Sequence, residues 1–393
     1  MDLLSRAESL APDLVGIRRD IHAHPELSFQ ETRTAALVAE RLQEFGYEVQ
    51  TGVGVTGCIG ELGTGPGRTV ALRADMDALP IQEANDVPYR SRYDGVMHAC
   101  GHDAHVACLL GAAHLLAESA KRGDLPPGRL RLLFQPSEET TDQENVGGAM
   151  RMIEAGAMDG VDAVIGLHVA TESPVGQVLF REGALMAGND TLRGTIMGAN
   201  AHAALPHEGV DAIVLTSQVM QAVQTIVARR IDPLEPAVIT FGTIAGGTAE
   251  NIVCAEVNLE GTLRYFSFDV RERLHRELRR AFALADALGG QGRLEIREGN
   301  PPVVNDPKLN DLVRSAAQST LGEAQVFVAD QIMGAEDFAH LTQDTPGCFF
   351  WLGAGIEDDP RSHHSPRFDI DESCLPRGAA VLAAAAHKAL AEW

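Results

Sequence analysis

Residues 98–105 contain four side chains that can bind a soft or borderline divalent metal. They are His98, Cys100, His102 and His105. Gly101 permits a tight turn, so Cys100 and His102 can converge where the chain enters the apolar helix predicted to follow. A thiol at a helix N-terminus shifts towards the thiolate, the form that binds metal. Taken alone, the stretch fits a structural, histidine-rich helix start as well as it fits a metal site.

Further metal-capable groups follow predicted strands elsewhere in the chain. They are Glu138 and Glu139 after residues 129–135, His168 at the end of residues 163–168, and the pair His363 and His364. Singly, each has an ordinary interpretation: a solvated turn, a buried core histidine and a polar loop. Together they supply what a two-metal hydrolytic site needs, which is ligands from several strands and one carboxylate left free. We expect Glu139 to be a ligand and Glu138 the general base.

Two aspartates at another strand end complete the candidate set. Asp75 and Asp77 directly follow the strand predicted over residues 69–73, and they can orient ligating histidines through hydrogen bonds. A plain acidic strand end is the alternative. We interpret His98 and His105 as neighbours of the metals or as structural residues. The cysteines other than Cys100 are interpreted as ordinary thiols.

These groups must be positioned by an α/β scaffold. Helices predicted over residues 2–22 and 31–45, and strands alternating with helices from residue 47 to residue 168, indicate a mixed sheet flanked by helices. Between residues 191 and 298 the order becomes strand, helix, strand, strand, helix, strand, which predicts a split βαβ (ferredoxin-like) α+β unit. We therefore expect a discontinuous catalytic domain over residues 1–187 and 299–393, with an inserted domain over residues 188–298.

Composition limits the classes of function. The 393-residue chain has a formal net charge of -23, which argues against a nucleic-acid or anionic membrane partner. Its apolar runs are too short to span a membrane, and the N-terminus has no apolar core for export. Six cysteines are spread without close pairing, which is typical of a reducing compartment. We expect a cytoplasmic protein.

The joint order of several motifs resembles the hippurate hydrolase and indoleacetyl-amino-acid hydrolase branch of the aminoacylase-like metallopeptidases, a branch that also holds N-acetyldiaminopimelate deacetylases. The resemblance spans essentially the whole chain. The motifs that carry it are residues 18–22, 24–26, 73–80, 97–103, 135–139, 166–169, 202–207, 246–251, 261–264, 336–338 and 363–366.

This resemblance implies two divalent ions per chain, zinc, manganese, cobalt or nickel, in an α/β catalytic domain of the metallopeptidase type. The implied ligands are Cys100, His102, Glu139, His168 and His364, with the Cys100 thiolate standing where related branches use a bridging aspartate. Glu138 matches the catalytic base. His202 matches a histidine that stabilises the oxyanion across a dimer, and Asn251 and Arg264 match positions that hold the substrate carboxylate. The inserted domain would be the lid and would form the homodimer.

The resulting hypothesis is hydrolysis of an N-acyl amino acid, of the hippurate, indoleacetyl or acetyl type, to a carboxylic acid and a free amino acid. A deacetylase of N-acetyldiaminopimelate or of another dedicated N-acetyl amino acid is the nearest alternative. Carbamoyl-amide hydrolases and dipeptidases are less favoured because their branches carry an aspartate at the position of Cys100. A catalytically silent dimeric binding protein is the alternative outside enzymes, and metal analysis separates it from the hydrolase.

Overall fold

The computed structural model describes residues 2–393, which fall into two compact units. Unit 1 contains the residues up to Leu185 together with Val304–Asp330 and Asp337–Trp393, and unit 2 contains Met186–Val303 and Gln331–Glu336. Each unit has a separate cluster of buried apolar side chains. Each unit therefore has its own core.

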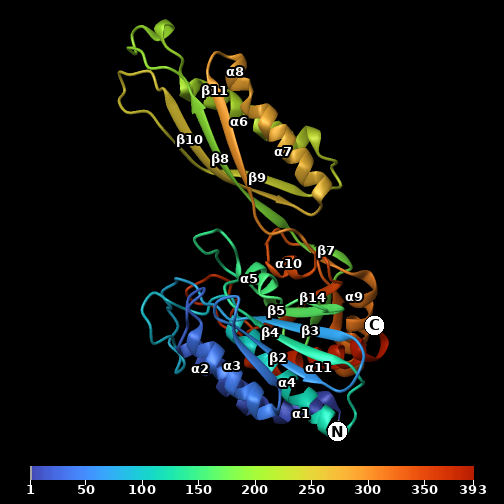
Figure 1. Ribbon diagram of the computed structural model, residues 1–393. Helices are drawn as coiled ribbons and strands as arrows, with labels where there is room; N and C mark the ends of the chain where they lie inside the picture. The colour runs from blue at the N-terminus through green and yellow to red at the C-terminus, as the bar shows by residue number, and fades with distance from the viewer. Residues whose placement is uncertain (1) are drawn as a thin grey trace. The chain divides into compact units, whose positions relative to one another are not determined.

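Unit 1 is built on a mixed sheet of eight strands in the order β1-β2-β4-β3-β5-β14-β6-β13 (Figure 1). The strands are β1 (Glu48–Val53), β2 (Gly57–Gly63), β3 (Thr69–Asp75), β4 (Arg129–Gln135), β5 (Ala163–Pro174), β6 (Val178–Phe180), β13 (Val326–Val328) and β14 (Gly347–Gly355). The central strands β4, β3, β5 and β14 run parallel to one another. The pairs β1–β2, β2–β4 and β14–β6 are antiparallel. This arrangement confirms the predicted α/β class with a mixed sheet.

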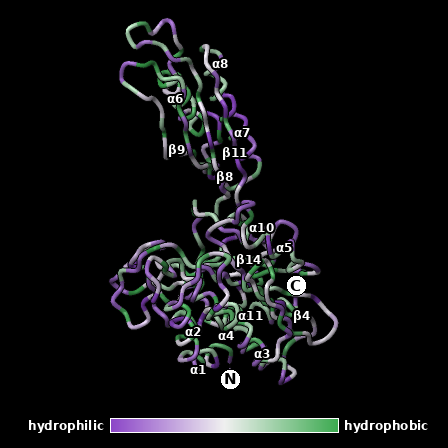
Figure 2. The backbone as a smooth tube through the Cα atoms, turned by 60° about the vertical axis from the view of Figure 1, so that its left-hand side comes forward, coloured by the Kyte–Doolittle hydropathy of each residue, from purple (hydrophilic) through white to green (hydrophobic). Residues whose placement is uncertain are grey.

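Helices pack against this sheet. They are α1 (Leu3–Ser9), α2 (Ala11–Ala23), α3 (Thr32–Phe45), α4 (His102–Arg122), α5 (Gly148–Glu154), α9 (Pro307–Leu321), α10 (Phe338–Leu341) and α11 (Leu375–Glu392). The alanine-rich helices α4 and α11 contact each other and β3, and the backbone around them is coloured as hydrophobic in Figure 2. None of the helices among residues 2–393 combines the length and the apolar character that crossing a bilayer requires.

The helix predicted over residues 2–22 is interrupted in the structure. It forms α1 and α2, which meet at Leu10, with Pro12 in the first turn of α2. Proline has no backbone N–H and favours a helix start over a helix interior, which accounts for the break.

Unit 2 confirms the predicted split βαβ order. Its antiparallel sheet has the order β11-β8-β10-β9. Its elements are β8 (Gly188–Met197), α6 (Ala212–Arg230), β9 (Ala237–Gly246), β10 (Glu256–Tyr265), α7 (Phe268–Phe282), α8 (Leu284–Ala287) and β11 (Gln291–Glu298). Buried and more exposed positions alternate along β8 and β10, and the buried residues join α6 and α7 in one core. The short strands β7 (Gly183–Met186) and β12 (Val303–Asn305) form a separate two-stranded sheet at the points where the chain passes from one unit to the other.

Candidate metal centre

The parallel strands β3, β4 and β5 end on the same edge of the sheet, where ligand sites collect in α/β folds. Asp75 ends β3, Glu138 and Glu139 follow β4, and His168 lies in β5. The helix α4 begins at this edge after Gly101, whose φ is 97°. A β-carbon at Gly101 would lie 2.3 Å from Val169 Cγ2, so glycine is required both by the turn and by the close approach.

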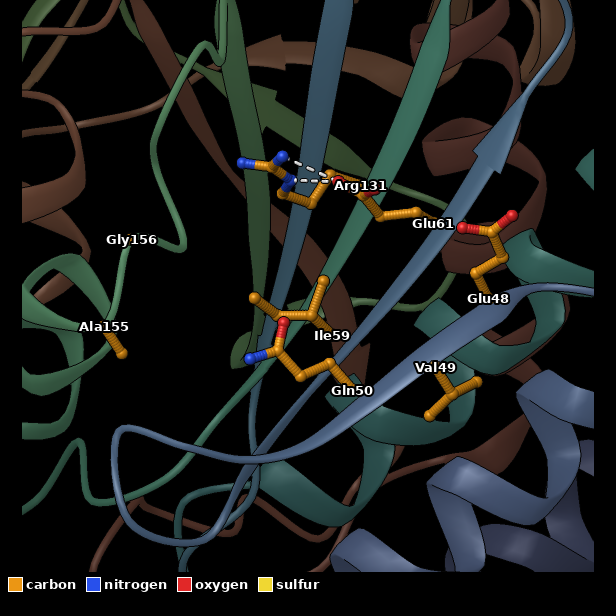
Figure 3. A pocket seen from close by; sticks show the side chains of 8 residues that line it. All are labelled: Glu48, Val49, Gln50, Ile59, Glu61, Arg131, Ala155 and Gly156. Carbon is orange, nitrogen blue, oxygen red and sulfur yellow. Dashed lines mark hydrogen bonds and ion pairs between the residues drawn. The ribbon is translucent and has the colours of Figure 1, made fainter.

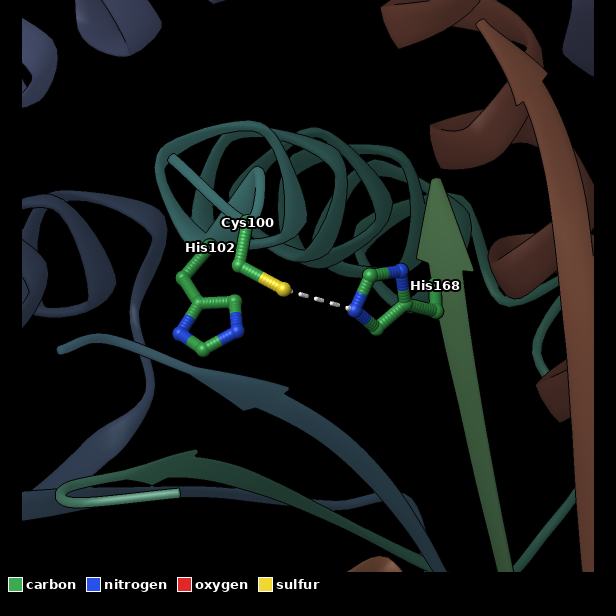
Figure 4. Close-up of side chains that lie close together, drawn as sticks. All are labelled: Cys100, His102 and His168. Carbon is green, nitrogen blue, oxygen red and sulfur yellow. Dashed lines mark hydrogen bonds between the residues drawn. The ribbon is translucent and has the colours of Figure 1, made fainter. Parts of the chain in front are cut away.

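Cys100, His102 and His168 form one group of potential ligands (Figure 4). One ligand atom from each of the three lies within 4.8 Å of the other two. Cys100 Sγ is 3.4 Å from His168 Nε2, and the two side chains point toward each other in Figure 4. The sequence separates these residues by 68 positions, and the strand β5 and the turn before α4 bring them together.

Glu139 and His364 form a second group that shares Cys100. His364 Nε2 lies 3.0 Å from Glu139 Oε1, and His102 Nε2 lies 4.0 Å from the same oxygen. The structure therefore gathers all five predicted ligands in unit 1. His364 has a φ of 58°, a strained value for a residue other than glycine, and its N–H donates to Ala99 O at 2.8 Å.

Hydrogen bonds to the Nδ1 atoms of two of these histidines turn their Nε2 atoms toward the other candidate ligands. His102 Nδ1 bonds Asp77 Oδ1 at 3.1 Å, and His168 Nδ1 donates to Val169 O at 2.7 Å. Such partners fix the ring orientation of metal-ligating histidines. Asp75 bonds His105 Nδ1 at 2.6 Å instead. His105 therefore has a structural bond, and its Nε2 accepts from Val169 N at 3.0 Å.

The protonation of the cluster also bears on metal binding. Burial and the neighbouring carboxylate of Glu139 raise the pKa of Cys100 well above its ordinary value. The expected lowering of this pKa by the dipole of α4 is thus outweighed, and a thiolate at this position requires a cation beside it. Burial and the adjacent imidazoles, His105 first, lower the pKa of His168, which keeps it in the neutral form that binds metal.

The donor set fits divalent cations. His102 Nε2 is buried and has no hydrogen-bond partner within the described part of the chain, a costly arrangement unless another group occupies that side of the ring. One thiol, three imidazoles and one carboxylate form a mixed set of the type that binds zinc and neighbouring transition metals.

Glu138 lies beside the ligands, partly buried. It forms a further group with His102 and Glu139, again with one ligand atom from each within 4.8 Å. Its N–H donates to Asp77 Oδ1 at 3.0 Å, and its Oε1 accepts from Asp337 N at 3.4 Å. The main chain of the predicted base is therefore anchored at the end of β4.

The other predicted site residues, His202, Asn251 and Arg264, belong to unit 2. His202 and Asn251 lie on adjacent segments: Ala203 N donates to Asn251 O at 3.0 Å. His202 Nδ1 accepts from Ala204 N at 3.0 Å. Arg264 lies in β10 and is half-buried, and burial lowers its pKa. Their roles in catalysis and substrate binding remain predictions.

The contacts of some residues near the cluster could not be predicted from the sequence. In the sequence His363 is only half of a histidine pair, but its Nδ1 lies 3.9 Å from Cys100 Sγ. Glu31 is only the start of a predicted helix, yet its carboxylate accepts from the N–H of Ser137. No spacing signal pointed to Glu31, because the contact spans 106 positions. His98 is buried, and neither of its ring nitrogens has a hydrogen-bond partner among residues 2–393.

A separate depression of about 310 Å³ lies over β1 and β2 (Figure 3). The residues that line it are Glu48, Val49, Gln50, Ile59, Glu61, Arg131, Ala155 and Gly156. Arg131 and Glu61 are paired at 2.6 Å, and the predicted site residues are not part of this lining. The depression is therefore distinct from the candidate metal centre.

The fold and the metal-capable cluster at the strand ends are those of metal-dependent hydrolases. Residues 71–388 match the model of Peptidase family M20/M25/M40. The chain belongs to this family, and it is a hydrolase of the metallopeptidase and amidohydrolase class.

Curated relatives align over almost the whole chain. Thermostable carboxypeptidase 2 of Saccharolobus solfataricus is 41% identical, over 96% of this chain and 97% of its own length. N-acetyl-L-cysteine deacetylase of Bacillus subtilis is 40% identical, over 97% and 89%. IAA-amino acid hydrolase ILR1-like 4 of Arabidopsis thaliana is 38% identical, over 96% and 86%.

Solved structures show the same architecture. A dinuclear metal binding peptidase of the M20 family from Bacillus subtilis superposes with a TM-score of 0.85 at 34% identity, covering 98% of this chain and 100% of the other. A putative aminohydrolase from methicillin-resistant Staphylococcus aureus superposes with a TM-score of 0.91 at 35% identity, covering 99% of both chains.

Proposed function

We propose that the protein hydrolyses the amide bond of N-acyl amino acids, releasing a carboxylic acid and a free amino acid. The observation that carries this proposal is the convergence of Cys100, His102, Glu139, His168 and His364 next to a carboxylate, Glu138, that can act as a base. The names of the relatives support the substrate class. A carboxypeptidase, an N-acetyl-L-cysteine deacetylase and an IAA-amino acid hydrolase all imply an amide bond adjacent to a free carboxylate.

In this proposal the five ligands hold two divalent cations. When bound, such ions polarise the amide carbonyl and make water a stronger acid. Glu138 accepts a proton from the attacking water while the water oxygen bonds to the carbonyl carbon. Glu138 then delivers this proton to the amide nitrogen as the carbon–nitrogen bond breaks. The bonds that Asp77 makes to the main chain hold Glu138 in place during both transfers.

Residues of unit 2 complete the proposal. His202 would donate a hydrogen bond to the carbonyl oxygen as negative charge develops there. Arg264 and Asn251 would bind the substrate carboxylate, because the paired donors of a guanidinium match the two carboxylate oxygens. We assign residues 1–187 and 299–393 to the catalytic domain and residues 188–298 to a lid and dimerisation domain.

Exposed apolar side chains support a homodimer formed through the inserted domain. Strand β9 is an edge strand, paired only with β10 within its sheet. Ile244 of β9 is 56% exposed, and Ile213 and Val214 of α6 are 54% and 56% exposed. An unpaired edge with apolar neighbours is a common site of self-association. All six cysteines are free, which supports the proposed cytoplasmic location.

A dedicated N-acetyl amino acid deacetylase is the second candidate, favoured by the 40% identity to N-acetyl-L-cysteine deacetylase. A panel of N-acetyl, N-benzoyl and N-indoleacetyl amino acids separates the two, if it is run on metal-stripped protein reloaded with zinc, manganese, cobalt or nickel in turn. A broad hydrolase should cleave all three acyl classes, whereas a dedicated deacetylase should accept only the acetyl class.

The same panel tests the base. We expect Glu138→Gln to lower kcat by at least about a thousandfold, within the range for loss of a general base, while two ions per chain remain bound. A Glu138→Gln enzyme that keeps more than about a tenth of the wild-type kcat would show that the base assignment is wrong.

A further inference from the structure

Three successive main-chain N–H groups around the predicted base donate to buried carboxylates. Ser137 N donates to Glu31 Oε1 at 2.9 Å. Glu138 N and Glu139 N donate to the two oxygens of Asp77, each at 3.0 Å. The loop that carries the base and one ligand is therefore held by its backbone, and Glu31 holds its first residue.

Ser137 is the point at which this loop needs holding. It has a φ of 47°, in the left-handed region that residues other than glycine seldom adopt, and its side chain is fully buried. The side chain of Ser137 bonds within the same loop, where its Oγ donates to Thr140 O, and this bond does not tie the loop to the rest of unit 1. The contacts that bind the Ser137 peptide to the rest of unit 1 are Glu31 on its N–H and Gly148 N on its carbonyl oxygen, the latter at 2.9 Å.

Glu31 is itself fixed from three sides. It lies immediately before α3 and is fully buried. The same Oε1 accepts from Phe29 N at 3.0 Å, and Oε2 accepts from the hydroxyl of Thr56, which lies between β1 and β2. The carboxylate thus joins the start of α3, the β1–β2 turn and the loop after β4.

Keeping a carboxylate in this position is costly. The donors that Glu31 accepts from, Phe29 N, Ser137 N and the Thr56 hydroxyl, are all uncharged, and burial raises its pKa to about 7. A buried acid without a cation is seldom retained for stability alone. An apolar side chain of similar size would fill the same space, so the acceptor oxygens point to a specific use.

We propose that Glu31 is a positioning residue for catalysis, which holds the Ser137 peptide in its left-handed conformation and thereby aims Glu138 at the reacting water. This inference rests on the proposed role of Glu138 as the base. Glu31 acts only through the main chain of residues 137–139 and does not contact the substrate or the metals.

The variants Glu31→Met and Glu31→Gln test the proposal on full-length, metal-loaded protein. Methionine has a similar size but no acceptor oxygen, so the loop should relax and kcat should fall about a hundredfold, the loss expected for a displacement near 1 Å. KM should stay within about threefold and two ions per chain should remain, because the ligands themselves are intact. Glutamine keeps one acceptor oxygen for Ser137 N and Phe29 N, so it should restore kcat to within about fivefold of wild type.

Glu26→Met is the matched control. Glu26 also bonds backbone N–H groups at the start of α3, those of Arg33 and Thr34 at 2.9 and 2.8 Å, but its carboxylate does not contact Ser137. Glu26→Met should lower the melting temperature and leave kcat unchanged. An unchanged kcat in Glu31→Met, or an equal loss of kcat in Glu26→Met, would overturn the proposal.

A fallback variant and a parallel control complete the test of Glu31. If Glu31→Met does not fold, Thr56→Val removes only the hydroxyl that donates to Glu31, and it should lower kcat roughly threefold; a wild-type kcat would count against the proposal. Glu138→Gln, measured in parallel, distinguishes a failure of the proposed function from a failure of the proposed role of Glu31. An active Glu138→Gln enzyme refutes the proposed function, whereas an inactive one beside a fully active Glu31→Met refutes only the role of Glu31.

Discussion

Both carboxylate oxygens of Asp77 act on the candidate site. Oδ1 accepts from Glu138 N and bonds His102 Nδ1 at 3.1 Å, while Oδ2 accepts from Glu139 N and from the Ser28 hydroxyl. Burial alone would raise the pKa of Asp77, but the bond to His102 and the charge of that imidazole outweigh it and lower the pKa. The ionised form is therefore favoured, and this single side chain bonds two proposed ligands, His102 and Glu139, and the proposed base, Glu138.

At this scale we predict that Asp77→Asn impairs both chemistry and metal binding. Asparagine has only one acceptor oxygen in place of two. Its NH₂ group would face the N–H of Glu138 or of Glu139, which would then lose its acceptor. We expect metal affinity to fall about 10- to 100-fold, as for other partners of metal-ligating histidines, and kcat to fall even at saturating metal. Isothermal titration with zinc and steady-state kinetics measure the two effects. Wild-type values for both would mean that Asp77 is only a strand-end acid.

The candidate ligands could be recognised from the sequence, whereas the hydrogen-bond partners of the loop that carries them could not. Cys100, His102 and Glu139 are chemically distinctive residues in short motifs, so their residue types and order suffice. The bond between Glu31 and Ser137 depends on how a helix start, a turn and a loop pack in three dimensions. Glutamate before a helix is ordinary in sequence, and only its burial distinguishes it.

At the scale of elements, the close approach of α5 to the end of β4 shapes the loop that carries the proposed base, Glu138. Gly148 begins α5, and a β-carbon there would lie 1.6 Å from Pro136 O and 2.9 Å from Ser137 O. Both obstacles are backbone atoms, which cannot rotate away. The start of α5 therefore lies directly against residues 136 and 137, and only glycine permits this approach.

We predict that Gly148→Ala displaces this loop and lowers kcat by about a hundredfold or more, together with a lower melting temperature. Gly147→Ala is the control one residue earlier, because its β-carbon would meet only Asp337 Oδ2, at an ordinary 3.5 Å. Kinetics and thermal unfolding of the two variants provide the comparison. Equal activity in both would contradict the tight packing of α5 on the loop.

Most elements were predicted from the sequence, and the exceptions have physical reasons. The strand β4 was predicted with the bounds that the structure shows. The strand β2 was missed because its residues Gly57–Gly63 include three glycines, which weaken any strand pattern. The strand β14 was missed because it is buried throughout most of its length, so its residues do not alternate between apolar and polar.

At the scale of the whole molecule, the two units divide the chemistry. All five proposed ligands and the proposed base lie in unit 1, whereas the residues proposed to bind the substrate lie in unit 2. Unit 2 has an internal anchor of its own: Asp190 of β8 is fully buried and pairs with His275 at 2.6 Å and Arg271 at 3.2 Å. The order of elements in unit 2, strand, helix, strand, strand, helix, strand, could be predicted from the sequence because each element has a clear apolar pattern.

We propose above all that Cys100, His102, Glu139, His168 and His364 hold two metal ions, while Glu138 beside them does not bind metal. Anomalous X-ray diffraction from crystals of the zinc-loaded protein, collected on both sides of the zinc absorption edge, tests it most directly. We expect two anomalous peaks per chain, each within bonding distance, about 2.0–2.3 Å, of atoms from these five residues. A single peak, or peaks bound by other side chains, would contradict it.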